Sequence, residues 1–357
     1  MKKKLNIAFA GGGTGGHVTP ISSLIQYVNE HNEIQQRIQQ MYRFGSTGQM
    51  EQEFAAKHES VVFVPIRSGK LRRYRTIKST LENLRDVAYF NAGYLQSLRN
   101  LQSNKIDVVF CKGGYVALPV VFAAASLRIP VIVHESDIHA GLVNKIASKV
   151  AKKNFDGFPG VLKNSTHVGQ ILSWDLLNPD NSLDIFTIQP GKKTLLVMCG
   201  SQGSDAVFKR ILEELDSEWQ VVKNVNIVVI LGKLNTSYKK KFEQYMNVTT
   251  YDFLNHHELA RLFEIADVTI TRGSATTLAE MEYFDLPKVI VPLPSHDQPL
   301  NAKWYANQHG DIVVAQDNMG ELFKAVEFHL EHEKAIVKKK EFFAAHEKIW
   351  EALLGVK

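Results

Sequence analysis

Short runs of apolar residues alternate with amphipathic stretches along most of the chain. The first run, Leu5–Phe9, leads into a glycine-rich segment, and residues 18–28 then place apolar side chains on one helical face. The same order of strand, glycine-containing loop and helix returns at residues 106–127 and again at residues 194–215. Strands that alternate with helices predict parallel sheets covered on both faces. The chain is therefore expected to form two doubly wound α/β domains.

The regular pattern is interrupted after Lys163 by a segment with little periodicity, which includes Asn178-Pro179-Asp180-Asn181. A chain of 357 residues is long enough for two domains with separate cores. We expect an N-terminal domain over residues 1–163 and a C-terminal domain over residues 164–338. A last helix, within residues 339–357, can return to the first domain. Ligands are expected in a cleft that the two domains face.

The composition is that of an ordinary globular protein, with 45% hydrophobic residues, 22% charged residues and a net charge of +5. Basic residues gather from Lys70 to Lys78, before a stretch of helical periodicity. Such a loop can attach to the phosphates of an anionic membrane or lipid, at ~1 kcal/mol per close charge; a solvated face is the alternative reading. No stretch suits a membrane span or a signal peptide. We therefore expect a cytoplasmic protein with peripheral membrane contact.

The segment after the first strand contains five glycines and then His17. Glycines let backbone N–H groups approach a ligand closely, and a helix N-terminus favours an anion such as a diphosphate. The Gly11-x-Gly13-x-x-Gly16 spacing also occurs in dinucleotide sites, but the expected second strand, Gln40–Phe44, ends without the acid that would bind a ribose. His17 can point toward the ligand of this loop, or it can merely cap the helix.

Polar clusters follow several later strands, at the edge where open α/β sheets bind ligands. The cluster His134–Asp137 can bind a hydroxylated ligand or supply a base, with helix capping as the alternative. Neutral hydrogen-bonding residues and helix starts recur at residues 200–204, 272–277 and 297–302. Such loops suit a sugar nucleotide. The absence of a Walker-type phosphate loop argues against nucleotide hydrolysis, and no Cys/His cluster has zinc spacing. We expect no cofactor.

Together these motifs resemble the MurG family, the UDP-N-acetylglucosamine:N-acetylmuramyl-(pentapeptide) pyrophosphoryl-undecaprenol N-acetylglucosamine transferases of bacterial walls. The matching segments keep the family's order along nearly the whole chain: Gly12–His17, Ser68–Leu71, Lys112–Val116, His134–Asp137, Phe158–Gly160, Gly200–Gly203, Arg272–Glu280 and Gln298–Ala302. The resemblance implies a GT-B fold, in which two Rossmann-like domains face a cleft. It also implies inverting, metal-independent transfer of GlcNAc from UDP-GlcNAc to the MurNAc C4 hydroxyl of lipid I, undecaprenyl-diphospho-MurNAc-pentapeptide. The product would be lipid II for peptidoglycan synthesis.

The resemblance also implies roles for individual residues. His17 would be the catalytic base, with Glu135 as second choice. In the first half, the substrate-binding residues would be Thr14, Gly15, Gly16, Gly113, Gly114, Tyr115 and Asp137. In the second half, Leu254 would lie near uracil and Glu280 would bind the ribose. The diphosphate and GlcNAc would contact Ser201, Gln202, Ser274, Ala275, Thr276, Thr277, Leu278, Ala279, Asp297, Gln298 and Asn301. The implied partners are UDP-GlcNAc, lipid I and the anionic inner-membrane surface of a bacterium, and not nucleic acid.

Three segments depart from the family pattern. Asp137 stands where Asn is usual, and Arg272–Ala275 reads Arg-Gly-Ser-Ala in place of Arg-Ser-Gly-Ala. Residues 170–173 replace Asn-Pro-x-Arg, so that Ser173 stands where a basic residue near UDP is usual. Two alternatives stay open: a glycolipid synthase that transfers hexose to diacylglycerol, and a non-catalytic paralogue in a wall-synthesis complex.

Overall fold

The computed structural model describes residues 3–13, 15–69, 77–180, 186, 188–217, 223–294, 297–332 and 344–356, with side chains left out over 77–84. It divides into two compact units, residues 1–174 with 340–357 and residues 175–339. The division follows Trp174 rather than residue 163, because residues 165–167 add a strand to the first sheet and Trp174 is buried in the first unit. Helix α7 (Trp174–Leu177) lies at the division.

Seven parallel strands form the sheet of the first unit, in the order β3-β2-β1-β4-β5-β6-β7. Their bounds are β1 (Leu5–Gly11), β2 (Ile38–Gly45), β3 (Val61–Pro65), β4 (Val108–Gly113), β5 (Val131–Glu135), β6 (Lys153–Asp156) and β7 (Ser165–His167). The strand order reverses between β1 and β4. In open parallel sheets the loops that leave the carboxyl ends of two such strands diverge, and ligands bind between them.

Helices cover both faces of this sheet, because successive strand residues point to opposite faces and both sets are apolar. The helices of the first unit are α1 (Gly15–Asn29), α2 (Asn32–Gln35), α3 (Met50–Ala56), α4 (Ile77–Ser103), α5 (Ala117–Ser126), α6 (Leu142–Ala147) and α15 (Ala344–Leu354). On one face Val109 and Val133 share a buried cluster with Leu101 of α4 and Val120 of α5. The other face packs against α1 and α15.

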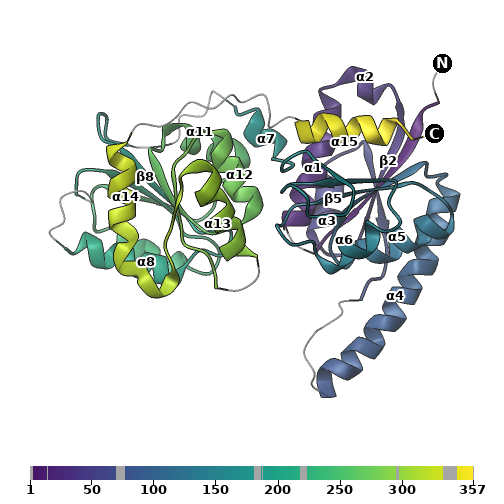
Figure 1. Ribbon diagram of the computed structural model, residues 1–357, viewed down its shortest axis with the longest axis horizontal. Coiled ribbons are helices and arrows are strands. Elements are labelled where there is room, and N and C mark those ends of the chain that lie inside the picture. The colour runs from purple at the N-terminus through teal and green to yellow at the C-terminus, as the bar shows by residue number, and fades with distance from the viewer. Residues whose placement is uncertain are drawn as a thin grey trace. The chain divides into compact units, whose positions relative to one another are not determined.

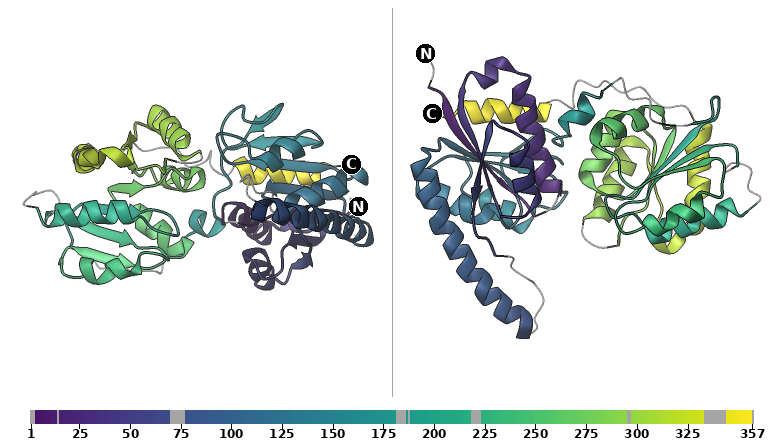
Figure 2. Two further views of the ribbon diagram at one scale, coloured as in Figure 1. Left: turned by 90° about the horizontal axis from the view of Figure 1, so that it is seen from below. Right: turned by 180° about the vertical axis from the view of Figure 1, so that it is seen from behind.

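The last helix, α15, completes the core of the first unit. The ring of Trp350 meets Phe9 of β1 edge-on, with centroids 6.1 Å apart, and its Nε1 donates a hydrogen bond to the carbonyl oxygen of Leu24 at 3.0 Å. Figure 1 shows α15 in yellow beside the purple α1, and both views of Figure 2 keep it against this unit. Residues from the two ends of the chain therefore build one core.

Six parallel strands form the sheet of the second unit, in the order β10-β9-β8-β11-β12-β13, which reverses between β8 and β11. The strands are β8 (Thr194–Met198), β9 (Asn226–Ile230), β10 (Val248–Tyr251), β11 (Val268–Thr271), β12 (Lys288–Ile290) and β13 (Ile312–Val313). The helices are α8 (Asp205–Leu215), α10 (Lys239–Phe242), α11 (His256–Ile265), α12 (Ala275–Tyr283), α13 (Gln298–His309) and α14 (Leu322–Glu331), with short 3-10 turns η1 (Thr236–Tyr238) and η2 (Gln316–Glu321).

The core of the second unit follows the same alternation. Val197, Val229 and Ile270 pack with Phe208 of α8 and Phe323 of α14 on one face. Figure 1 shows α12 and α13 on the opposite side of the sheet from α14. The prediction of two doubly wound α/β domains is thus confirmed. Over the described ranges, no helix combines the length and the apolar character needed to cross a bilayer.

Candidate functional site

Two glycine loops meet where the first sheet reverses its strand order. Gly13 and Gly114 both have positive φ, +91° and +78°. A Cβ on Gly13 would lie 2.7 Å from the ring of Tyr115, and a Cβ on Gly114 would collide with the carbonyl oxygen of Gly12 and lie 3.0 Å from Cδ2 of His17. Larger residues are excluded at both positions by conformation and by space. The loops after β1 and β4 therefore pack directly on each other and on His17.

His17 lies in the first turn of α1, half-buried. Burial, together with the nearby positive charge of Lys112, lowers its pKa to about 4, so the imidazole is neutral at pH 7. Within the described part of the chain, its buried Nδ1 has no hydrogen-bond partner. A neutral imidazole can accept a proton, and an anion bound nearby would make it a stronger base.

Two buried basic side chains lie next to these loops, and burial lowers the pKa of one of them, Lys112. The Nζ of Lys112 donates a hydrogen bond to the Ser136 hydroxyl at 2.7 Å. The guanidinium of Arg43 donates to the carbonyl oxygens of Phe9 and Gly11, and burial lowers its pKa only to about 10, so it stays charged at pH 7. Buried positive charge at a glycine loop favours the binding of an anion.

Glu51 of α3 supports the first loop from inside the protein. Its carboxylate is fully buried, and Oε1 accepts a hydrogen bond from the backbone N–H of Gly13 at 3.2 Å. A Cβ on Gly12 would collide with the same carboxylate, and the negative charge of Glu51 favours the charged form of Arg43. Motif spacing predicted neither residue, because Arg43 lies inside an expected strand and Glu51 in a segment without a recognised motif.

Glu135, at the end of β5, has both carboxylate oxygens occupied. Oε1 accepts hydrogen bonds from the backbone N–H groups of Ser136 and Asp137, at 2.7 and 3.0 Å. Oε2 accepts from the N–H of Gly141 at 2.9 Å and from Nδ2 of Asn144 at 3.0 Å. Four donors on one buried carboxylate hold the loop from β5 to α6 in place. This geometry favours a positioning role for Glu135 over the role of a base that is open to substrate.

The remaining first-half positions fall on the same edge of the sheet. Gly15 and Gly16 open α1, Gly113 ends β4, and Asp137 is half-buried in the loop after β5. Thr14 lies outside the described residues. The hydrogen bond from Lys112 to Ser136 links the loop after β4 to the cluster that contains Asp137.

Residues 170–173, which depart from the family pattern, are buried in the first unit. The Gln170 side chain donates a hydrogen bond to the carbonyl oxygen of Ser136 at 2.7 Å, and the carbonyl oxygen of Leu172 accepts one from the Ser23 hydroxyl at 2.5 Å. Ser173 is also buried. These residues therefore serve the packing of the first unit.

In the second unit, Arg272 connects the loops on either side of the point where the strand order reverses. Its Nη2 donates to the hydroxyl of Ser204 at 2.7 Å, and its Nη1 donates to the carbonyl oxygen of Val291 at 2.9 Å. The Ser204 hydroxyl in turn accepts from the N–H of Val207 and caps α8. A buried guanidinium thus joins the carboxyl ends of β8, β11 and β12.

The loop after β8 presents Ser201 and Gln202, both exposed. Their carbonyl oxygens accept hydrogen bonds from the N–H of Lys233 at 3.0 Å and from Nδ2 of Asn235 at 2.6 Å. Gly203 has a φ of +76°, and a Cβ there would collide with the carbonyl oxygen of Leu231. These contacts fix the backbone of the loop after β8, while the side chains of Ser201 and Gln202 stay accessible.

Helix α12 starts directly after β11, with Ser274 as its N-cap and no side-chain hydrogen bond to the cap. Its first N–H groups suit an anion such as a diphosphate. The polar residues of this segment, Ser274, Thr276 and Thr277, are half-buried, whereas its apolar residues, Ala275, Leu278 and Ala279, are buried. One turn further on, Glu280 is buried, and burial raises its pKa to about 8. Its carboxyl is mainly protonated at pH 7.

Gln298 and Asn301 of α13 hold the loop after β11. Oε1 of Gln298 accepts from the N–H groups of Gly273 and Leu293, at 3.2 and 3.0 Å. Nδ2 of the buried Asn301 donates to the carbonyl oxygen of Gly273 at 3.0 Å. Both predicted sugar contacts therefore have structural partners inside the unit, which motif spacing does not show.

Two further predicted residues stand at helix starts. Asp297 is the half-buried N-cap of α13. Leu254 is buried just before α11, which opens with a reciprocal capping box between Asn255 and Glu258. All predicted second-half residues thus lie in the loops and first two helical turns that follow β8, β10, β11 and β12.

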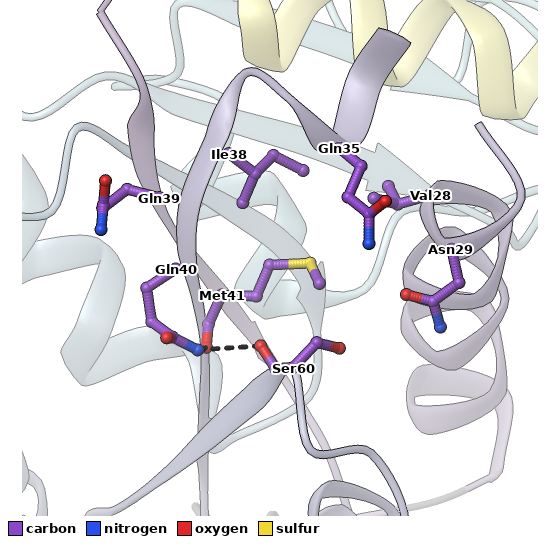
Figure 3. A pocket seen from close by; sticks show the side chains of 8 residues that line it. All are labelled: Val28, Asn29, Gln35, Ile38, Gln39, Gln40, Met41 and Ser60. Carbon is purple, nitrogen blue, oxygen red and sulfur yellow. Dashed lines mark hydrogen bonds between the residues drawn. The ribbon is translucent and has the colours of Figure 1, made fainter. Parts of the chain in front are cut away.

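A separate hollow of about 180 Å³ lies at the amino end of β2, away from these loops (Figure 3). Its lining consists of Val28, Asn29, Gln35, Ile38, Gln39, Gln40, Met41 and Ser60. Neutral amides dominate it, so it offers neither a base nor a charge to a ligand. Among the described residues, no group of three or more His, Cys, Asp or Glu is placed to hold a metal ion.

Comparison with known proteins identifies the relatives of both units. The glycosyltransferase family 28 N-terminal domain matches residues 7–155, and the C-terminal domain of the same family matches residues 194–351. The chain is 35% identical to a UDP-N-acetylglucosamine--N-acetylmuramyl-(pentapeptide) pyrophosphoryl-undecaprenol N-acetylglucosamine transferase of Staphylococcus carnosus, over 85% of this chain and 82% of the relative. The enzyme of the same description from Shouchella clausii is 33% identical, over 89% and 88%.

Solved structures share the fold at lower sequence identity. The crystal structure of Acinetobacter baumannii MurG aligns with a TM-score of 0.71 at 22% identity, covering 98% of this chain and 99% of that one. A UDP-GlcNAc 2-epimerase of Neisseria meningitidis, bound to UDP-GlcNAc, aligns with a TM-score of 0.67 at 15% identity, covering 98% and 99%. Since proteins of different activity share this fold, the fold alone does not identify the reaction.

Proposed function

Since the chain belongs to the MurG family of glycosyltransferase family 28, we propose that it transfers GlcNAc from UDP-GlcNAc to the MurNAc C4 hydroxyl of lipid I and forms lipid II. The observation that carries the proposal is that each sheet has anion-suited loops where its strand order reverses. Donor and acceptor each bring one diphosphate. Two separate anion-suited sites, one in each unit, therefore match two diphosphate substrates.

The second unit is the proposed donor site. The UDP diphosphate lies at the N-terminus of α12 and near Ser201 and Gln202, where N–H groups and hydroxyls meet its oxygens. Glu280 takes the ribose hydroxyls, and Leu254 lies near uracil. The hydrogen bonds of the buried Arg272 hold the loops after β8 and β11 together.

The first unit is the proposed acceptor site. The lipid I diphosphate lies on the loops that contain Gly13 and Gly114, with the basic side chains of Arg43 and Lys112 buried next to them. This places the adjoining MurNAc near His17. The neutral imidazole then takes the proton of the C4 hydroxyl while that oxygen bonds to C1 of GlcNAc.

The bond from C1 to the diphosphate of UDP breaks in the same step, and its electron pair leaves with UDP. Attack from the opposite face inverts the anomeric centre. The N–H groups at the start of α12 stabilise the charge that develops on the departing diphosphate. No metal is required in this scheme.

The test is transfer of labelled GlcNAc from UDP-GlcNAc to a lipid I analogue in the presence of EDTA. We expect transfer by the wild type and a loss of kcat of about 10²- to 10⁴-fold in His17→Ala, the range for removal of a general base. His332→Ala, at the exposed C-cap of α14, is the matched control and should keep full activity. Full activity in His17→Ala would show that another group is the catalytic base. Transfer to diacylglycerol but not to lipid I would show that the proposed acceptor is wrong.

We further propose that the first unit associates peripherally with the anionic inner-membrane surface. Val87, Phe122 and Leu142 of α4, α5 and α6 are exposed apolar residues of this unit. The basic segment predicted at Lys70–Lys78 lies largely outside the described residues. Sedimentation with phosphatidylglycerol vesicles should show binding that weakens with salt. Equal binding to neutral vesicles would contradict an electrostatic contribution.

A further inference from the structure

An apolar cavity of about 300 Å³ lies in the first unit beside the proposed acceptor loops. Its lining comes from the segment before α4 and from α4, α5, α6 and the loop after β4: Gly69, Asp86, Val87, Phe90, Tyr115, Leu118, Leu142 and Val143. Asp86 is the acid in this lining. It is 5% exposed and lies 3.7 Å from the guanidinium of Arg85. The cavity thus offers mainly hydrocarbon surface.

The cavity shares a wall with the proposed diphosphate site. Tyr115 lines the cavity, and its ring is also the group that a Cβ on Gly13 would meet at 2.7 Å. On another side, Leu142 and Val143 follow Gly141, whose N–H is held by the Glu135 carboxylate at 2.9 Å. The loop network of the acceptor site therefore also fixes two walls of the cavity.

The entrance of the cavity is apolar and open to solvent. Val87 is 50% exposed and Leu142 is 48% exposed. Three residues after Val87, the ring of Phe90 meets Phe122 edge-on, with centroids 5.8 Å apart. Apolar side chains grouped around an open cavity are typical of a site that an apolar ligand covers.

We propose that this cavity seats the isoprenoid units of the acceptor lipid that lie nearest its diphosphate. The inference rests on the proposed function, which supplies an acceptor whose hydrocarbon chain starts at the oxygen of a phosphate. A chain that leaves a diphosphate held on the Gly13 and Gly114 loops meets Tyr115 and the cavity behind it first. Burial of its CH₂ and CH₃ groups there adds affinity in proportion to the apolar area covered.

The first test uses the full-length protein and soluble lipid I analogues that carry one, two, three or four isoprene units, without membranes and below their micelle concentrations. We expect KM for the acceptor to fall about tenfold over the first units, because each buried carbon adds affinity until the cavity is filled. Further units should change KM little, and kcat should stay constant. A KM that is independent of chain length in the wild type would overturn the proposal.

Substitutions in the cavity lining test whether the cavity causes the dependence of KM on chain length. Val143→Phe should fill the cavity and remove the dependence of KM on chain length, while the one-unit acceptor and UDP-GlcNAc bind as before. Leu118→Trp should do the same from α5 and serves if the first variant misfolds. Val150→Phe is the control, since Val150 is 51% exposed and outside the lining. Persistence of the chain-length dependence in both cavity variants would place the chain elsewhere, such as on the surface that contacts a bilayer.

A binding measurement separates this proposal from the proposed function. Calorimetry should show that geranyl diphosphate binds the wild type about tenfold more tightly than inorganic diphosphate, because of the buried chain. Val143→Phe should bind both equally. This result would support the cavity as an isoprenoid seat even if no GlcNAc transfer occurred. Equal binding of the two ligands to the wild type would show that the cavity does not bind the isoprenoid chain, even if transfer to lipid I were efficient.

Discussion

At the scale of single residues, burial determines which side chains are charged when the substrates bind. It lowers the pKa of His17 to about 4 and raises that of Glu280 to about 8, so both side chains are mainly neutral at pH 7. Positive charge near the acceptor loops comes from the buried Arg43, whose pKa stays at about 10, whereas burial lowers the pKa of the neighbouring Lys112. Each substrate therefore meets a neutral group that can change protonation on binding.

Glu280 predicts that UDP-GlcNAc affinity depends on pH. In the free protein the carboxyl is mainly protonated below about pH 8. Ribose hydroxyls that donate to a carboxylate favour its charged form, so binding lowers this pKa and releases a proton. Calorimetry in buffers of different ionisation enthalpy should show this release near pH 7, and affinity should rise from pH 6.5 to 8.5. Glu280→Gln should abolish both effects. A flat wild-type profile would contradict the ribose contact.

The low pKa of His17 predicts how the rate of transfer depends on pH on the acidic side of the profile. With UDP-GlcNAc saturating, kcat/KM for the acceptor reports the protein before the acceptor binds, where the His17 pKa is about 4. Protonation of this residue should therefore not reduce kcat/KM between pH 6 and 8. The acceptor diphosphate stabilises imidazolium and raises this pKa, so kcat should fall at a higher pH than kcat/KM does. If kcat and kcat/KM fell at the same pH, the acceptor diphosphate would not lie next to His17.

At the scale of elements, each glycine loop depends on a neighbouring element that fills the space behind it. Helix α3 brings Glu51 to the N–H of Gly13, and β2 brings Arg43 to the carbonyl oxygen of Gly11. In the second unit Arg272 does the same for the loops after β8 and β11. The loops are thus held in shape before any ligand binds, which lowers the cost of ordering them on binding.

The Arg43–Glu51 pair predicts a coupled loss of stability. Glu51→Gln removes the carboxylate charge that favours the charged form of the buried Arg43, which should reduce the free energy of unfolding of the first unit by about 0.5–3 kcal/mol. The double variant Arg43→Met with Glu51→Met removes both charges and should lose less than the sum of the losses in Arg43→Met and Glu51→Met. Urea unfolding of the wild type, these two single variants and the double variant measures the coupling. Additive losses would show that the two side chains do not interact.

At the scale of the whole molecule, the two units have separate cores, and one of them needs the end of the chain. The second unit is built from one continuous segment, whereas the first combines residues 1–174 with residues 340–357. Helix α15 places Trp350 on Phe9 in the middle of the first sheet. The first unit can therefore complete its core only after the second unit has been synthesised.

Trp350→Ala should therefore destabilise the first unit alone, by about 3–5 kcal/mol, as expected for truncation of a buried aromatic residue. Hydrogen exchange should accelerate in peptides of β1 and β4 and stay unchanged in those of β8 and β11. Phe208→Ala, in the core of the second unit, should give the reverse pattern. Equal acceleration in both sheets after either change would mean that the two units unfold together.

Local sequence was sufficient to predict the elements and the chemistry of their loops. Apolar periodicity indicated the alternating strands and helices, and glycine spacing indicated anion-suited loops, because both depend on backbone conformation within a few residues. The order of the motifs indicated the family, which the comparisons confirm. Most predicted site residues do lie at the carboxyl edges of the two sheets, since they follow strands that run parallel.

Tertiary structure decided which loops meet and what stands behind them. The strand order places β1 beside β4 and β8 beside β11, which periodicity cannot show because strand neighbours are chosen by contacts far apart in sequence. Burial of Arg43 and Glu51, the four donors on Glu135 and the packing of α15 into the first core also depend on such contacts. The charge state of His17 and Glu280 follows from desolvation, which exists only once the chain has folded around them.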